Sequence, residues 1–137
     1  MTFLEYCQNL KPEDWGVRIN DSWTVKDLVA HMVGWEKGFI EIIEALVNHR
    51  DRPWFMSEDQ WSRYNEKSVR EYKEHGPSEL LLEWEKWQKE LKETTVRFGE
   101  SNLRKYPELV EWVFDTSENS HYNHHLRQIK EVLEKHP

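Results

Sequence analysis

Hydrophobic residues recur every three or four positions along much of this chain, the spacing expected of helices that bury one face. The clearest stretch runs from Thr24 to about Asn48, with Thr24 placed as an N-cap and Asp27 supplying an acid in the first turn. The residues on its inward stripe are Leu28, His31, Trp35, Phe39, Ile42 and Leu46. No segment shows the alternation of a strand, so the pattern predicts an all-α fold.

Two further segments precede and follow this helix. A short helix is expected from Thr2 to about Gln8, ending before the Lys11-Pro12 pair. Ser57–Gln60 has the form of a capping box, which predicts a helix from there to about Lys73.

The second half of the chain predicts two more long helices. Gly76 and Pro77 open a helix with apolar positions over five turns, and Gly99 is placed to end it. Residues 100–114 are expected to form a short helix or a loop. Asp115–Glu118 is a second candidate capping box, opening a final helix to about Lys135. Four such helices with mostly short connections predict a four-helix bundle with an additional short N-terminal helix.

Length and charge narrow the class of protein. A chain of 137 residues is long enough for one core, so a single domain covering 1–137 is expected. The net charge of −7 argues against a nucleic-acid partner. A single cysteine, Cys7, fits a reducing compartment, and no signal peptide or run of about 18 apolar residues is visible. We therefore expect a cytoplasmic protein with no membrane partner.

Three histidines carry the most specific chemical signal. His121 and His125 are four residues apart, so they lie one above the other on a helix face and can share one ion. His31 lies on the inward stripe of the first long helix and would complete a three-histidine site for zinc, nickel or ferrous iron. Each histidine also has an ordinary interpretation, a hydrogen-bonded core residue for His31 and a surface pair for the other two. His124 forms an alternative same-face pair with His121.

Three segments of the chain resemble the DinB-like superfamily, metal-binding four-helix bundles that include thiol-dependent transferases. Trp23–His31 (WTVKDLVAH) is similar to the opening of that superfamily's second helix, W-[ST]-x-x-[DE]-[LV]-[LIV]-x-H. Trp61–Glu66 resembles an asparagine-bearing third segment, and His121–Ile129 resembles the closing H-x-x-x-H-x-x-Q-I motif. The resemblance covers nearly the whole chain and implies that His31, His121 and His125 bind the metal. The first helix is shorter than is usual in the superfamily, which favours a homodimer.

Four residues are candidates for a substrate pocket beside the metal. Trp35, Trp61 and Tyr122 would supply aromatic walls, and Asn65 would orient a substrate or a bound water. Ordinary core packing is the alternative for the tryptophans, and a position on the helix surface is the alternative for Asn65.

The expected function is that of a metal-dependent enzyme acting on a small-molecule substrate. Family resemblance suggests transfer of a low-molecular-weight thiol, isomerisation or hydrolysis. The sequence contains no Gly-rich phosphate loop, nucleophile elbow or Cys-x-x-Cys pair, so phosphoryl transfer, serine hydrolysis and thioredoxin-type chemistry have no support. Two alternatives stay open: a non-catalytic bundle that binds a small ligand or a metal, and a structural protein that acts through an interface.

Overall fold

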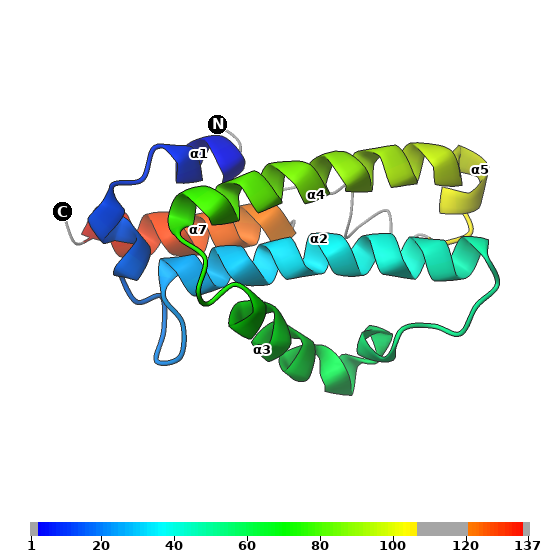
Figure 1. The fold of residues 1–137 in the computed structure, drawn as a ribbon, viewed down its shortest axis with the longest axis horizontal. Helices are drawn as coiled ribbons and strands as arrows, with labels where there is room; N and C mark the ends of the chain where they lie inside the picture. The colour runs from blue at the N-terminus through cyan, green and yellow to red at the C-terminus, as the bar shows by residue number, and fades with distance from the viewer. Residues whose placement is uncertain (1–2, 107–120, 136–137) are drawn as a thin grey trace.

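The computed structural model describes residues 3–106 and 121–135, and within these ranges the chain is helical without any strand (Figure 1). The all-α prediction is confirmed for this part of the chain. Its α-helices are α1 (Phe3–Gln8), α2 (Val25–Val47), α3 (Trp61–Glu71), α4 (Pro77–Phe98), α5 (Glu100–Leu103) and α7 (His121–Lys135). Three short 3-10 helices lie between them: η1 (Pro12–Gly16), η2 (Trp54–Met56) and η3 (Glu58–Gln60).

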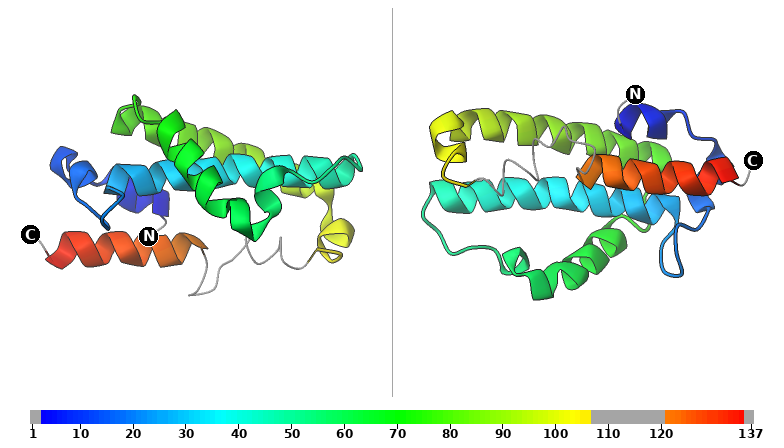
Figure 2. Two further views of the ribbon diagram at one scale, coloured as in Figure 1. Left: turned by 90° about the horizontal axis from the view of Figure 1, so that it is seen from below. Right: turned by 180° about the vertical axis from the view of Figure 1, so that it is seen from behind.

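The two longest helices, α2 and α4, run side by side in the same direction (Figures 1 and 2). The helices α3 and α7 run in the opposite direction. α3 crosses one side of α2, whereas α7 lies along the half of α2 that begins at Val25. No helix in the described ranges combines the length and the apolar character needed to cross a bilayer.

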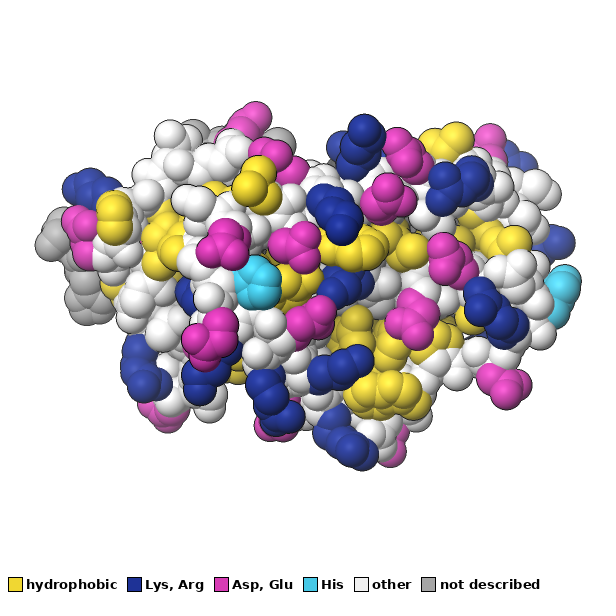
Figure 3. All heavy atoms as spheres, viewed as in Figure 1, with side chains coloured by type: hydrophobic (Ala, Val, Ile, Leu, Met, Phe, Trp, Pro, Cys, Tyr) yellow, Lys and Arg dark blue, Asp and Glu magenta, His cyan; other side chains and the backbone are white. Residues whose placement is uncertain are grey.

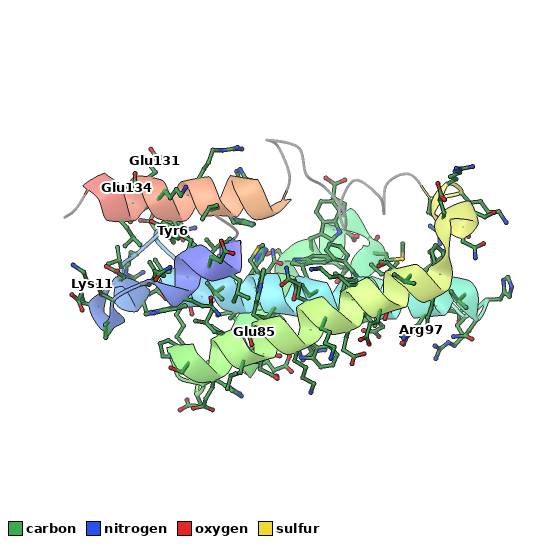
Figure 4. The ribbon with its side chains drawn as sticks, turned by 90° about the horizontal axis from the view of Figure 1, so that it is seen from above. Tyr6, Lys11, Glu85, Arg97, Glu131 and Glu134 are labelled. Carbon is green, nitrogen blue, oxygen red and sulfur yellow. The ribbon has the colours of Figure 1, made fainter. Side chains whose placement is uncertain are left out.

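The short helix α1 lies between α4 and α7 (Figure 4). Its Phe3 ring stacks on Trp84 of α4 with ring centroids 5.0 Å apart. Its Tyr6 points toward α7, where Lys130 lies 5.4 Å from the centre of the ring. Although α1 has only six residues, it is thus held on both sides.

The start of α2 and the end of α4 follow the sequence signals. At the start of α2 the Thr24 hydroxyl accepts a hydrogen bond from the Asp27 amide at 3.2 Å, and the Asp27 carboxylate accepts one from the Thr24 amide at 3.0 Å. This reciprocal pair satisfies two amide groups that the helix itself leaves unbonded. At the C-terminal end of α4, Gly99 has φ of 86°, a backbone conformation that glycine adopts without a steric penalty.

The predicted capping box at Ser57–Gln60 is wrong. Residues Glu58–Gln60 form the 3-10 helix η3, and the Ser57 side chain makes no capping hydrogen bond. Its hydroxyl instead bonds to the side chain of Asp59, which lowers the pKa of that carboxyl. As a result α3 begins at Trp61 without a side-chain cap and ends at Glu71, two residues before the predicted end. The second candidate box, Asp115–Glu118, lies outside the described residues.

Buried side chains form two apolar clusters that share α2. The first cluster joins the first half of α2 to α1, η1, α4 and α7, and its members include Phe3, Leu28, Met32, Trp84, Leu126 and Ile129. The second joins the second half of α2 to η2, α3 and α4, with Phe39, Ile42, Ile43, Phe55, Tyr64, Leu91 and Phe98. The inward stripe predicted for α2 therefore holds, with Trp35 and Leu46 only half-buried.

Two glycines let α3 approach α2 closely. A Cβ atom built on Gly34 would overlap the Oγ and Cβ atoms of Ser68, and one on Gly38 would lie 2.8 Å from the Tyr64 hydroxyl oxygen. The Tyr64 hydroxyl donates a hydrogen bond to the Gly34 carbonyl oxygen at 2.7 Å. This close crossing fixes where the side chains of α3 meet those of α2.

Candidate functional site

Two of the three predicted histidine ligands meet between α2 and α7. The rings of His31 and His125 have centroids 4.9 Å apart and planes at 88° to each other. His31 is 4% exposed and His125 is 9% exposed, so both are withdrawn from solvent. Side chains that lie more than 90 positions apart in the chain thus converge at one point of the interior.

A hydrogen bond sets the tautomer of His125. Its Nδ1 lies 2.6 Å from Oε1 of Gln128, and an amide oxygen can only accept, so Nδ1 carries the proton. The lone pair of the neutral ring is then on Nε2. Burial lowers the pKa of His125 to about 4, against which the bond to Gln128 acts only partly. At neutral pH this imidazole is therefore uncharged, the form that binds a metal.

The neighbours of the pair distinguish His125 from His124. His124 is exposed, although its ring centroid is 5.1 Å from that of His125. Only His125 of these two has its ring against His31. On the other side, Trp23 contacts His31 with ring centroids 5.0 Å apart and an interplanar angle of 45°. His31 is thus enclosed between an indole and a second imidazole.

The third predicted ligand is His121 of α7. His121 and Tyr122 belong to the first turn of α7, but their side chains lie outside those the structure describes. Among the side chains that are described, no group of three histidine, cysteine or acidic residues is arranged to hold a metal ion. The three-histidine site therefore stays a prediction, of which one pair of rings is seen in contact.

The predicted pocket residues separate into two groups. Trp35 follows His31 by one helical turn, and its indole Nε1 donates a hydrogen bond to Asn65 Oδ1 at 2.6 Å. Both side chains are half-buried, and the Trp35 ring also meets Tyr64 with centroids 4.8 Å apart. Trp61, one turn before Asn65 on α3, is 36% exposed and lies at the surface. The structure therefore brings Trp35 and Asn65 together, whereas Trp61 lies at the surface.

Three residues with notable buried or polar contacts were not singled out from the sequence as site residues. Gln128, three positions after His125, could have been recognised from helical spacing as the partner of that ring. Glu36 is 1% exposed on α2, an unusual position for a carboxylate, and nothing in the local sequence indicates it. Lys37 bonds to Glu71 and Tyr72 across the α2–α3 interface, which only the packing of the helices reveals.

No known protein family, curated protein or solved structure gives a significant match to the chain. Function is therefore inferred from the side chains and their geometry, together with the resemblance of the three motifs.

Proposed function

We propose that this chain is a DinB-like four-helix bundle, built from α2, α3, α4 and α7, that holds a divalent metal ion and acts as an enzyme on a small molecule. The observation that carries the proposal is the contact between His31 and His125, whose ring centroids lie 4.9 Å apart. The two rings come from helices that the sequence motifs had singled out independently.

The separation of the rings fits two imidazoles on one ion. With a metal–nitrogen bond of about 2.0–2.1 Å, the centre of each ring lies about 3.2 Å from the metal. Two such rings at a tetrahedral angle have centroids about 5.2 Å apart, and at a right angle about 4.5 Å apart. The observed 4.9 Å lies between these values.

The surroundings of His125 also fit a role as a metal ligand. A metal-binding histidine commonly donates its second ring N–H to an oxygen, which orients the ring and leaves the other nitrogen for the ion. Gln128 supplies this oxygen at 2.6 Å. Because burial keeps His125 neutral at pH 7, no proton has to be displaced before an ion binds.

The third ligand in this proposal is His121, one turn before His125 on α7. Residues four apart on a helix present their side chains on the same face, so the spacing predicts that His121 shares the face of His125. Three imidazoles leave at least one coordination position for water or substrate, as catalytic sites require. Zinc, nickel and ferrous iron all accept such a ligand set.

A bound divalent metal supplies a Lewis acid that activates water or a low-molecular-weight thiol. The chain's own contribution is to enclose and orient the reactants. Trp23 covers the His31 ring, and Trp35 follows His31 by one turn on α2. Asn65 accepts from the Trp35 indole through its side-chain oxygen, and its amide group can also donate to a polar group of the substrate. The family resemblance suggests transfer of a thiol, isomerisation or hydrolysis as the reaction.

Metal content is the first test. Untagged protein purified without chelator is expected to contain about one equivalent of metal by mass spectrometry, and His125→Ala is expected to contain almost none. His49→Ala is the matched control, since His49 is exposed at the end of α2 and is expected to leave the metal unchanged. Absence of stoichiometric metal from the wild type, with no rise in melting temperature on adding zinc, nickel or ferrous iron, would rule the proposal out.

The aromatic contacts of the histidine pair also fit a second function, that of a structural or binding bundle without a metal. Trp23, His31 and His125 pack ring against ring, as aromatic side chains in a metal-free core also do. In that case the protein acts as a structural or binding bundle. Turnover of a thiol–electrophile pair that is lost in His31→Ala but kept in His49→Ala separates the enzyme from both a metal-binding protein and a structural one.

A further inference from the structure

A groove between α2 and α3 lies apart from the histidine pair. Its volume is about 420 Å³, within the range of about 300–1,000 Å³ typical of small-molecule sites. Charged side chains from both helices line it, namely Lys37, Glu41, Lys67, Arg70 and Glu71. We propose that this groove binds the anionic group of a small molecule, a carboxylate or a phosphate. The inference does not depend on the metal or on the histidines.

The lining of the groove has a net positive charge, whereas the whole chain has a net negative charge. Three cationic side chains face two carboxylates, which leaves the lining with one excess positive charge, whereas the chain carries −7. Figure 3 views this face and shows basic side chains gathered over α3. A local positive region on an acidic protein attracts a small anion while the rest of the surface repels it.

Lys37 is the fixed cation of the groove. Its ammonium group lies 2.6 Å from Oε1 of Glu71 and 3.1 Å from the Tyr72 hydroxyl, and it lies over the ring of Trp87 at 5.3 Å. Burial lowers the pKa of this amine, but the hydrogen bonds that it donates to Glu71 and Tyr72 raise the pKa overall, so the group is charged at neutral pH. An ammonium group has three N–H bonds, and these two acceptors leave one for a ligand.

Lys67 and Arg70 supply the adaptable cations. They are three residues apart on α3 and therefore lie on the same face of the helix. Neither forms an ion pair with any other side chain in the described part of the chain. Arg70 can bind a carboxylate or a phosphate through two parallel hydrogen bonds, and Lys67 adds a point charge.

Two side chains in the lining of the groove are held by hydrogen bonds within the protein. Tyr64 and Ser68 form its base, and both are buried against α2 at the close crossing with Gly34. The Ser68 hydroxyl donates to the Tyr64 carbonyl oxygen at 3.0 Å, and the Tyr64 hydroxyl donates to Gly34. Since these groups are already bonded within the protein, the anion is recognised mainly by Lys37, Lys67 and Arg70.

Titration of the full-length chain with inorganic phosphate and, separately, with acetate tests the proposal. The ionic strength is kept constant with chloride, and amide chemical shifts are followed by NMR. Saturable shifts centred on Gly34 and Ser68 are expected, and Arg70→Gln is expected to raise the apparent Kd at least fivefold. Tighter binding of phosphate identifies a phosphoryl ligand, and tighter binding of acetate identifies a carboxylate.

The matched control lies on α4. A shallow depression there is lined by Lys92, Glu93, Val96 and Arg97, so it also carries two cations and one carboxylate (Arg97 is labelled in Figure 4). Arg97→Gln is expected to leave the titration unchanged. Shifts that do not saturate, or an equal loss of binding in Arg97→Gln and Arg70→Gln, would overturn the proposal, because either result indicates general attraction to surface charge.

Discussion

The Tyr64 hydroxyl donates a hydrogen bond to the Gly34 carbonyl oxygen at 2.7 Å, and this bond joins α3 to α2 at their closest approach. Burial raises the pKa of Tyr64, so the phenol keeps its proton and remains a donor. Both the candidate pocket at Trp35 and the groove at Lys37 lie within one turn of Gly34 on α2. The α2–α3 crossing thus positions side chains for both proposed sites.

Gly34→Ala tests the closeness of this crossing. The added methyl group would overlap the Ser68 side chain, so we expect the free energy of unfolding to fall by about 1–3 kcal/mol. The measurement is urea denaturation. Gly16→Ala is the control, because a Cβ there meets no atom within 4 Å.

A Ser68→Gly background tests whether overlap with Ser68 causes the loss of stability expected for Gly34→Ala. With the serine side chain removed, Gly34→Ala is expected to stabilise the protein by up to about 1 kcal/mol, since alanine is the better helix former. If the alanine destabilised both backgrounds equally, the proposed overlap would be wrong.

The buried imidazole of His125 predicts a pH dependence in the metal-free protein. The pKa of this group falls from 6.5 to about 4 on folding, so the unfolded chain binds one more proton between these pH values. Stability is therefore expected to decrease as pH falls from about 6.5 to about 4, by about 3 kcal/mol in total. Urea denaturation of the wild type and of His125→Asn measures it. The variant should lack this component, and an unchanged pH profile would contradict the assignment.

Gln128→Ala tests the orientation of His125 within the proposed metal site. Loss of the oxygen that accepts from Nδ1 is expected to lower zinc affinity about 10–100-fold, as is usual when such a partner is removed. Competition with a chromophoric chelator gives the affinity. His124→Ala should bind zinc as the wild type does, because His124 is exposed. Equal losses in the two variants would place the ion elsewhere on α7.

Lys37→Met tests the polar contacts between α2 and α3. It removes an ion pair with Glu71 and a hydrogen bond with Tyr72, for an expected loss of about 1–2 kcal/mol. Arg104→Met breaks the pair with Glu100, which is highly exposed and local to one helix, and should cost less than about 0.5 kcal/mol. Thermal denaturation of both variants gives the comparison, and equal effects would show that Lys37 adds nothing beyond a surface pair.

Helix positions were predictable where the sequence carries strong periodicity and a cap. Thr24 and Asp27 marked the start of α2, and Gly99 marked the end of α4, because each satisfies a local requirement of the backbone. The capping box predicted at Ser57 was wrong because a serine hydroxyl can bond to a neighbouring side chain instead of a helix amide. The Ser57 hydroxyl bonds to Asp59 in this way.

The candidate site was predictable only in part. The meeting of His31 with His125 followed from the inward stripe of α2 and the motif spacing. The bond between Trp35 and Asn65 and the network of Lys37 depend on how closely two helices approach. That distance is set by Gly34 and Ser68, and a glycine or a serine within a helical segment does not by itself indicate that another helix crosses there.

Because α2 contributes side chains to both apolar clusters, we expect it to tolerate insertions poorly. His31 and Lys37 are six residues apart on one uninterrupted helix. One residue inserted between them would turn the later half of α2 by about 100° relative to the earlier half. The face of α2 that packs against α7 or the face that packs against α3 would then no longer meet its partner helix. The length of α2 between His31 and Lys37 is therefore constrained far more tightly than that of the connection at residues 50–53.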